Sequence, residues 1–197
     1  QHEKRTNNRE NYINQGRDDV DILELRLHMQ TKQWKNQLSL HYGFDTSYEW
    51  IDSKAWDTLV RSEVTQERSR GQYIADSTYQ RADTWANLFW QWKTLKARFG
   101  ARVNYNKADS PGDEETESKA IHLSWTGLVL GGGLTWQAHR YGQLILNIDE
   151  GFAPPNLDDL TARQLTGQGF QIENAQLGSE KSVSSEVGVK ITHKRVY

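Results

Sequence analysis

Alternation of apolar and polar residues recurs along almost the whole chain, and this period of two constrains the fold more than any other feature. In DILELRLHMQ, residues 21–30, leucine and methionine alternate with charged and polar side chains. The same alternation returns in QLSLHYGF (37–44), ANLFWQW (86–92) and ARFGARVNY (97–105). Successive side chains of a β-strand point to opposite faces, so the pattern indicates strands with one apolar and one polar face. No stretch keeps a helical spacing, and the sequence predicts an all-β fold.

The predicted connections alternate between short turns and long polar loops. Short turns are expected near residues 31–33, 95–96 and 138–141, and long loops at residues 49–82, 108–118 and 151–181. Long antiparallel strands in up-and-down hairpins, with short turns at one end and long loops at the other, are typical of transmembrane β-barrels. We therefore expect residues 1–17 to be a polar loop or tail. Residues 18–197 are expected to form a partial segment of such a barrel, with about seven strands.

Large amphipathic rings are frequent in a chain that is otherwise polar. The 197 residues include 8 Trp and 8 Tyr, although only 36% of the chain is hydrophobic. Trp and Tyr favour places where one end of the ring is apolar and the other is wet, as in the aromatic girdles of membrane barrels. A soluble antiparallel sandwich also has alternating strands. A soluble or surface β-sandwich binding module is therefore the alternative to a membrane barrel.

The two alternatives assign opposite surroundings to the same apolar residues. In a barrel these side chains face lipid, whereas in a sandwich they form the dry core. A barrel also requires its Arg and Glu side chains in a wet lumen. The residues expected to face lipid are Leu25, Leu27, Leu38, Leu40, Leu88, Trp90, Phe99, Val103, Leu144 and Leu146.

The sequence gives no support for an enzyme, a metal site or a nucleic-acid-binding protein. No serine lies in a nucleophile motif, and the six histidines are scattered along the chain. There is no cysteine, which excludes disulfides and a thiolate zinc site. The net charge of −2 provides no field that would attract nucleic acid. We expect no catalytic residue, no metal site, no cofactor and no nucleic-acid partner.

The stretch EGFAPPNLDDL, residues 150–160, places a rigid corner between an alternating strand and a long polar loop. Pro154 and Pro155 have no backbone N–H and cannot continue a strand ladder. Asn156 and the aspartates after it can hold a turn through bonds to nearby backbone groups. We expect the chain to leave the sheet here as a stiff arm that orients the loop 161–176 over the mouth of the barrel.

Two segments carry a resemblance to a known family. GFAPPNLDDL (151–160) resembles the Gly-Phe-Arg-Ala-Pro-Asn-Leu box of TonB-dependent outer-membrane receptors. ENAQLGSEKSVSSEVGVK (173–190) resembles their Asn-Pro-Asn-Leu-Lys-Pro-Glu-Lys-Ser…Glu-Gly-Val-Lys segment, in the same order and at a similar spacing. Ala153 stands where the family has arginine, and Asn174–Ala175 replaces its Asn-Pro pair. The matching residues are Gly151, Phe152, Pro154, Pro155, Asn156, Leu157, Glu180, Lys181, Ser182, Glu186 and Gly188.

The resemblance implies a part of the C-terminal barrel, without the plug domain, of a receptor in the outer membrane of a Gram-negative bacterium. Such a barrel has about 22 strands, so about seven strands cannot close it. Complete family members import scarce nutrients with energy from the TonB complex. The implied partners are the lipid bilayer, the TonB complex, the plug domain, and a ferric siderophore or similar chelate as ligand.

Ligand contacts are expected in the loop 161–176, with a second group of contacts in residues 61–70. Haem-importing members of the family place a histidine between the two boxes, but residues 156–173 contain none. This argues against haem as the cargo. The predicted ligand-contacting residues are Arg163, Gln164, Gln168, Phe170, Gln171 and Asn174.

Overall fold

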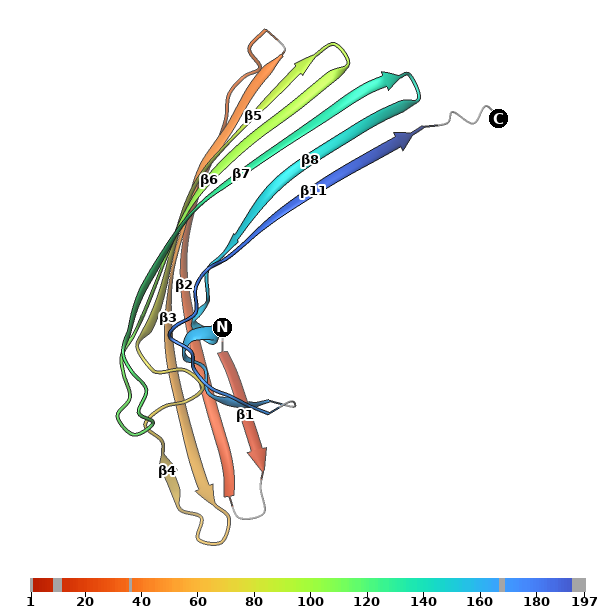
Figure 1. Cartoon of the computed structure of the whole chain (residues 1–197). Coiled ribbons are helices and arrows are strands. Elements are labelled where there is room, and N and C mark those ends of the chain that lie inside the picture. Colours follow the sequence, from red (N-terminus) through yellow and green to blue (C-terminus); the bar gives the residue numbers. More distant parts are fainter. Residues whose placement is uncertain (1, 9–11, 36, 167–168, 193–197) are drawn as a thin grey trace.

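The alternating segments pair edge to edge into one long, curved antiparallel sheet (Figure 1). The computed structural model describes residues 2–8, 12–35, 37–166 and 169–192. The strands are β1 (His2–Asn8), β2 (Tyr12–Gln30), β3 (Leu38–Leu59), β4 (Thr65–Glu67), β5 (Ser77–Trp92), β6 (Leu95–Ser110), β7 (Ile121–His139), β8 (Gly142–Ala153), β9 (Gln164–Thr166), β10 (Gly169–Gln171) and β11 (Glu180–Ile191). One short helix, α1 (Leu157–Thr161), follows β8.

The strands follow one another across the sheet in the order β1-β2-β3-β5-β6-β7-β8-β11, and β4 pairs with β3. The long strands of this sheet have 12 to 22 residues each, and they are β2, β3, β5, β6, β7, β8 and β11. The only other sheet in the described part of the chain is the two-stranded pair β9–β10. The predicted all-β, up-and-down barrel segment is therefore confirmed. The sandwich alternative is wrong, because no second large sheet packs against the first among the residues that the structure describes.

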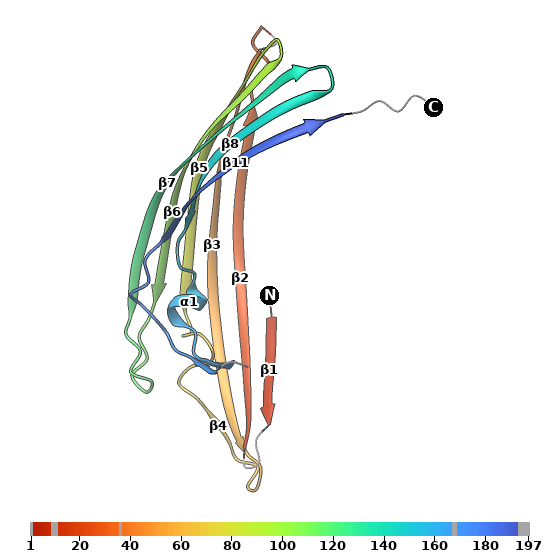
Figure 2. The ribbon, with the colours of Figure 1, turned by 45° about the vertical axis from the view of Figure 1, so that its right-hand side comes forward.

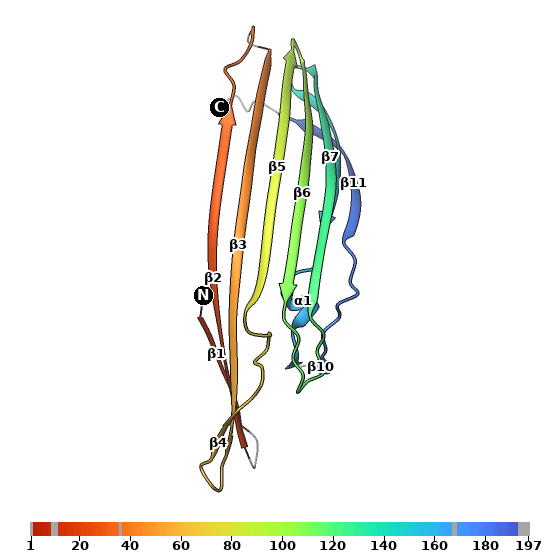
Figure 3. The ribbon, with the colours of Figure 1, turned by 90° about the vertical axis from the view of Figure 1, so that its left-hand side faces the viewer.

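The register gathers apolar side chains on one face of the sheet. Leu40 lies opposite Leu88, and Leu88 lies opposite Phe99. Directly opposed residues of antiparallel strands point to the same face. The ten residues that were expected to face lipid all share this face by register. It is the convex face, across which the strands lie side by side in Figure 3.

Aromatic rings border the apolar band of the convex face at both ends. At the short-turn end Trp90 and Trp92 stack with ring centroids 6.3 Å apart, and at the long-loop end Tyr48 and Trp50 are 4.2 Å apart. In the turns, the Lys93 ammonium lies 4.9 Å from the Trp92 ring centroid, and lysine or arginine also lies over Trp34 and Tyr141. Rings that are flanked by cations are typical of a boundary between an apolar layer and water.

The opposite, concave face carries mainly polar side chains along the long strands, and a buried apolar cluster lies near its long-loop end. There, α1 packs against the sheet, as Figure 2 shows. The buried cluster consists of Ile51, Tyr79, Ala108, Ile121, Leu157 and Leu160. Among the described residues, no helix has the length and apolarity that crossing a membrane would require.

Several predicted boundaries are wrong. The described residues 2–8 and 12–17 do not form the predicted loop or tail, because they belong to β1 and β2, and β1 pairs with residues 13–19 of β2. The loop expected at 49–82 is confined to residues 60–76, since β3 continues to Leu59 and β5 begins at Ser77. The turn expected at 95–96 lies at 93–94, and the other long loops are 111–120 and 154–179. Strands that extend beyond the apolar band carry polar residues on both faces, so they lose the alternation while keeping their backbone hydrogen bonds.

Candidate functional site

The Ala-Pro-Pro corner directs the chain onto the concave face of the sheet. β8 ends at Ala153, as the two prolines predicted, and α1 begins after only three intervening residues. Asn156 caps the helix: its side chain accepts from the backbone N–H of Asp159 at 2.8 Å. The Asp159 carboxylate in turn accepts from the Asn156 N–H at 3.2 Å, which completes a capping box. The corner is thus followed at once by a capped helical turn.

Two kinds of contact fix α1 against the sheet: burial of its apolar side and a hydrogen bond to a backbone carbonyl just before the helix. Leu157 and Leu160 are buried against the sheet. The hydroxyl of Tyr79 on β5 donates to the Pro155 carbonyl at 3.1 Å. The arm predicted from the sequence therefore packs onto the concave face of the sheet.

β8 separates from β7 at the point where it turns inward. The two strands pair only from His139–Gly142 to Gly131–Asp149, and in the described part of the chain residues 121–130 of β7 pair with β6 alone. Two contacts bridge the gap. The Glu150 carboxylate accepts from the Leu130 N–H at 2.9 Å, and the Phe152 ring covers Gly127, where a Cβ would lie 2.5 Å from the ring. Gly127 therefore leaves room for Phe152.

The second half of the family-like motif runs beside the first. Along β11 and β8, Glu180 pairs with Ala153, and Ser182 pairs with Gly151. Further along, the Glu186 carboxylate accepts from the side-chain amide of Asn147 at 3.3 Å. Lys181 and Gly188, also on β11, pair with Phe152 and Ile145 of β8. The two similar segments of sequence are therefore hydrogen-bonded neighbours at the base of the arm.

Arg70 joins three long loops at one buried point. Its side chain is only 3% exposed. One terminal nitrogen donates to the Ser118 hydroxyl and to the Glu173 carboxylate, both at 2.9 Å. The other donates to the carbonyls of Gln72, at 2.9 Å, and Thr161. Burial lowers the pKa of the Arg70 guanidinium while Glu173 opposes the shift, and arginine remains charged at neutral pH.

Further bonds surround this junction. Arg163 donates to the Thr116 carbonyl at 2.9 Å. On the other side, the side chains of Gln72 and Tyr73 donate to Asp158 of α1 at 2.9 and 3.0 Å. Residues 60–76, 111–120 and 154–179 thus form one hydrogen-bonded unit, which we call the loop rim. It lies at the lower end of the sheet in Figure 1.

The structure brings four of the six predicted ligand-contacting residues together, because the register of β9 and β10 places Gln164 opposite Gln171, beside Arg163 and Phe170. The Arg163 guanidinium lies 5.9 Å from the centroid of the Phe170 ring, which is 58% exposed. The Gln171 amide donates to the Asp158 carbonyl at 3.4 Å. Asn174 is exposed elsewhere on the loop rim, and its side chain accepts from the Gln176 N–H. Gln164 lies in β9, and Gln168 is outside the described residues.

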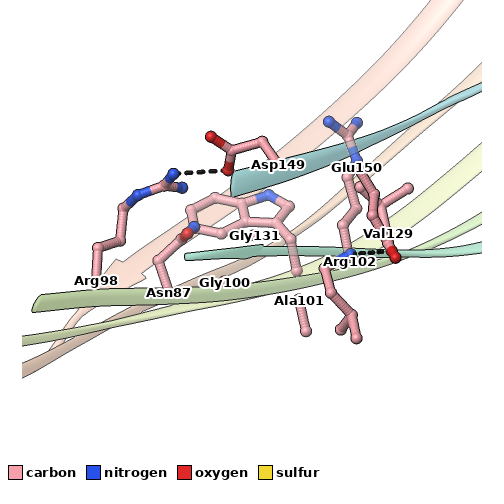
Figure 4. Close-up of a pocket in the computed structure, with 11 residues that line it drawn as sticks. Asn87, Arg98, Gly100, Ala101, Arg102, Val129, Gly131, Asp149 and Glu150 are labelled. Carbon is pink, nitrogen blue, oxygen red and sulfur yellow. Dashed lines mark hydrogen bonds and ion pairs between the residues drawn. The ribbon is translucent and has the colours of Figure 1, made fainter. Parts of the chain in front are cut away.

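A hollow in the concave wall was not predicted from the sequence. It has a volume of about 290 Å³ and lies between β5, β6, β7 and β8 (Figure 4). Gly100 and Gly131 lie opposite each other in its floor, and Arg98 donates to Asp149 beside them at 2.7 Å. The sequence contained one signal for this hollow, namely a glycine on the polar face of each of two strands that pair. Alternation predicted the polar face but not which strands would bring its glycines together.

Other charged residues on the concave wall are paired. Asp83, 1% exposed, accepts from Arg102 and from the Asn104 amide at 2.5 Å each. Asp45 accepts from His28 at 2.7 Å and from the Trp85 indole at 3.0 Å. Among the described residues, no group of three or more His, Asp or Glu side chains is arranged to hold a metal ion.

Replacing Arg70 by methionine should loosen the loop rim while leaving the strands intact. The change keeps an unbranched, flexible side chain but leaves Glu173 and the Thr161 carbonyl without their buried donor. The local free energy of opening should fall by about 2–3 kcal/mol. Amide hydrogen exchange in the intact protein measures this as faster exchange in residues 158–176. Arg68→Met is the matched control, because Arg68 is exposed and lies 4.0 Å from Asp57. Equal effects of the two changes would contradict the role of Arg70.

Adding one methyl group at Gly127 should displace the arm. In Gly127→Ala the new Cβ would overlap the Phe152 ring, so β8 and α1 must shift away from β7. Trypsin should then cleave after Arg163 faster than in the unmodified protein. Gly132→Ala adds the same group to the same strand, where its nearest contact is 3.7 Å away. This control should leave cleavage unchanged, and an unchanged rate in Gly127→Ala would show that Phe152 does not hold the arm.

Comparison with known proteins agrees with this geometry. The sequence profile described as TonB dependent receptor-like, beta-barrel matches residues 2–197. Among solved structures, a double mutant of the Serratia marcescens hemophore receptor HasR, in complex with its hemophore HasA and heme, has a TM-score of 0.69 and 12% identity, covering 94% of this chain and 31% of that one. The copper transporter OprC has a TM-score of 0.70 and 12% identity, covering 92% of this chain and 29% of that one. No curated protein matches.

The chain spans about a third of the length of these two structures. Proteins of this family are transporters of the Gram-negative outer membrane rather than enzymes. The profile covers nearly all of the sequence, and the fold is a partial barrel of the same kind. This chain therefore belongs to the TonB-dependent receptor family, as part of its β-barrel.

Proposed function

We propose that the complete protein is an outer-membrane receptor that imports a ferric siderophore or a similar chelate into a Gram-negative cell. The observation that carries this proposal is the loop rim. Three loops joined at buried Arg70 stand over a polar, concave wall, and an exposed surface remains on them. A ligand that meets a preorganised surface costs less ordering entropy than one that must order loose loops.

The exposed part of the arm supports the assignment of ligand contacts. Arg163 and Phe170 offer a cation beside an aromatic ring, and Gln171 and Asn174 offer amides on the same segment. Gln164 and Gln168 belong to the same loop in sequence. We assign these six residues to ligand contact. An aromatic ring, a guanidinium and amides suit a large polar chelate that has both apolar and oxygen-rich surfaces.

The nature of the cargo rests on the chemistry of the loop. HasR is described with heme and OprC as a copper transporter. Residues 156–173 of this chain contain no histidine that could serve as an axial ligand of haem iron. Amides and arginine favour recognition of an organic shell around a metal over direct ligation of the metal. A chelate is therefore the cargo that we propose.

The two faces of the sheet fit the surroundings that such a receptor provides. The convex face carries an apolar band with aromatic borders, which suits the hydrocarbon layer and its interfaces. The concave face carries paired charges and an open hollow of about 290 Å³, which suits a wet lumen. We propose that the convex face contacts the lipid bilayer and that the concave face meets the plug domain. The TonB complex would act through that plug.

Uptake by cells tests the proposed function. The full-length gene is expressed in a strain that lacks other receptors, in paired backgrounds with and without functional TonB. Uptake of iron is measured for ferric catecholate, ferric hydroxamate and haem, and uptake of copper for a copper salt. TonB-dependent uptake of one ferric chelate is expected. TonB-dependent uptake of haem or copper alone, or of none of the four, would contradict the proposal.

A loop variant tests the assigned contacts. Phe170→Ala should raise the half-saturating concentration of the chelate about tenfold, equivalent to about 1.4 kcal/mol. Val60→Ala is the control, because Val60 is 47% exposed on a different loop. Equal half-saturating concentrations in the two variants would remove Phe170 from the ligand surface.

Adjacent arginine substitutions test which face meets lipid. Val103 lies on the convex face and is 48% exposed, whereas Asn104 lies on the concave face beside Asp83. Val103→Arg should destabilise the barrel by about 2–4 kcal/mol, because a charge would enter the hydrocarbon layer. Asn104→Arg should have a smaller effect, since its charge can pair with Asp83. Denaturant unfolding of the full-length protein in lipid vesicles measures both, and a reversed order would contradict the assignment.

A further inference from the structure

A second hollow lies inside the loop rim, apart from the hollow in the concave wall. It has a volume of about 300 Å³ and lies between the start of β7 and residues 173–176. Its floor is formed by Ile74, Ile121 and Leu160, which are 6%, 4% and 0% exposed. The floor is therefore apolar, and the contacts around α1 hold it in place.

One polar group on the edge of this hollow retains bonding capacity. Glu173 is 25% exposed, and its Oε2 atom accepts from Arg70 at 2.9 Å and from the Ser118 hydroxyl at 3.0 Å. No described residue donates to its other carboxylate oxygen, Oε1. A carboxylate has about four acceptor positions. Glu173 can therefore accept a further hydrogen bond while its orientation stays fixed by Arg70 and Ser118.

The free acceptor oxygen of Glu173 disfavours an anion at the edge of the hollow. The charged residues that line the hollow are Glu117, Glu173 and Lys119, and Arg70 pairs with Glu173 from outside the lining. The terminal nitrogens of Arg70 are occupied by four acceptors, so they offer no donor to a bound anion. A hydrogen-bond donor beside Glu173 is favourable, whereas a carboxylate there would place two acceptors against each other.

The volume sets the size of the group that fits. A cavity of about 150 Å³ accommodates benzene. The hollow of about 300 Å³ can hold one substituted ring, together with a few polar atoms. A complete chelate with several arms would not enter it. The hollow thus suits one arm of a larger ligand.

We propose that this hollow is a subsite for one arm of the imported ligand, with an apolar body of about one ring that bears an N–H or O–H donor. The ring lies on Ile74, Ile121 and Leu160, and the donor bonds Glu173. The inference rests on the proposed function and deepens it, because it names a chemical feature that the ligand must carry. Among the predicted ligand-contacting residues whose side chains the structure describes, Asn174 lines this subsite.

Three one-ring probes test the subsite in the purified full-length receptor. Benzylamine and benzamide carry N–H donors, and benzoate carries only acceptors at neutral pH. Saturation-transfer NMR in detergent, with empty micelles as blank, should give dissociation constants of about 1–10 mM for the two donors. Benzoate should bind at least tenfold more weakly. Benzoate binding as tightly as benzylamine, or no binding of any probe, would overturn the proposal.

Two variants locate the probes. Ala175→Trp should fill the hollow from its exposed edge and abolish binding of both donors, whereas Leu177→Trp, two residues further on and outside the lining, should not. Glu173→Gln should weaken benzylamine about tenfold and leave benzamide nearly unchanged, because the glutamine oxygen still accepts from a neutral donor. An unchanged rate of tryptic cleavage after Arg163 verifies that the rim stays folded. Unaltered probe binding in Ala175→Trp would place the probes elsewhere.

The outcomes separate the subsite from the proposed function. TonB-dependent uptake of a chelate together with failure of all three probes would overturn the subsite alone. Probe binding at Glu173 without TonB-dependent uptake of any chelate would overturn the import proposal and leave the donor-binding subsite in place.

Discussion

The backbone hydrogen-bond ladder is the constraint on which the rest of this structure depends. Each strand of the wall satisfies its N–H and C=O groups through neighbouring strands. The hydrocarbon layer that we propose around the convex face would offer no water to do so. The ladder also sets which side chains share a face, since directly opposed residues point the same way. One register therefore delivers Leu40, Leu88 and Phe99 to the convex face, and Asn87, Gly100 and Asp149 to the concave one.

The loop rim exists because the ladder is interrupted at one place. β8 leaves β7 beyond Asp149, and the cost of the open edge is reduced by a carboxylate on the Leu130 N–H and by the Phe152 ring on Gly127. The freed chain places α1 on the concave face of the sheet. There, the Thr161 carbonyl of α1 and the Glu173 carboxylate accept hydrogen bonds from Arg70. The proline corner, the helix cap and the buried arginine together position the loops.

The strands and the corner could be predicted because their signals are local. Alternation in residues 21–30 or 97–105 is complete within one strand, and two adjacent prolines end a ladder wherever they occur. The junction at Arg70 could not be predicted in this way. Arg68 and Arg70 lie in the same polar loop with acidic neighbours, yet Arg68 is exposed and Arg70 is buried. Three of the four partners of Arg70 are 48, 91 and 103 residues away in the sequence.

The sequence by itself determined the all-β class, the two-faced strands, the end of β8 and the family, since each depends on neighbouring residues or on a contiguous motif. Only the tertiary structure decided that β1 pairs with β2 and that Phe152 replaces a side chain at Gly127. It also decided that Ile74, Ile121 and Leu160 enclose a hollow beside Glu173. These features join segments that are distant in the chain, and the register of the sheet together with the inward turn of β8 brings them within contact distance.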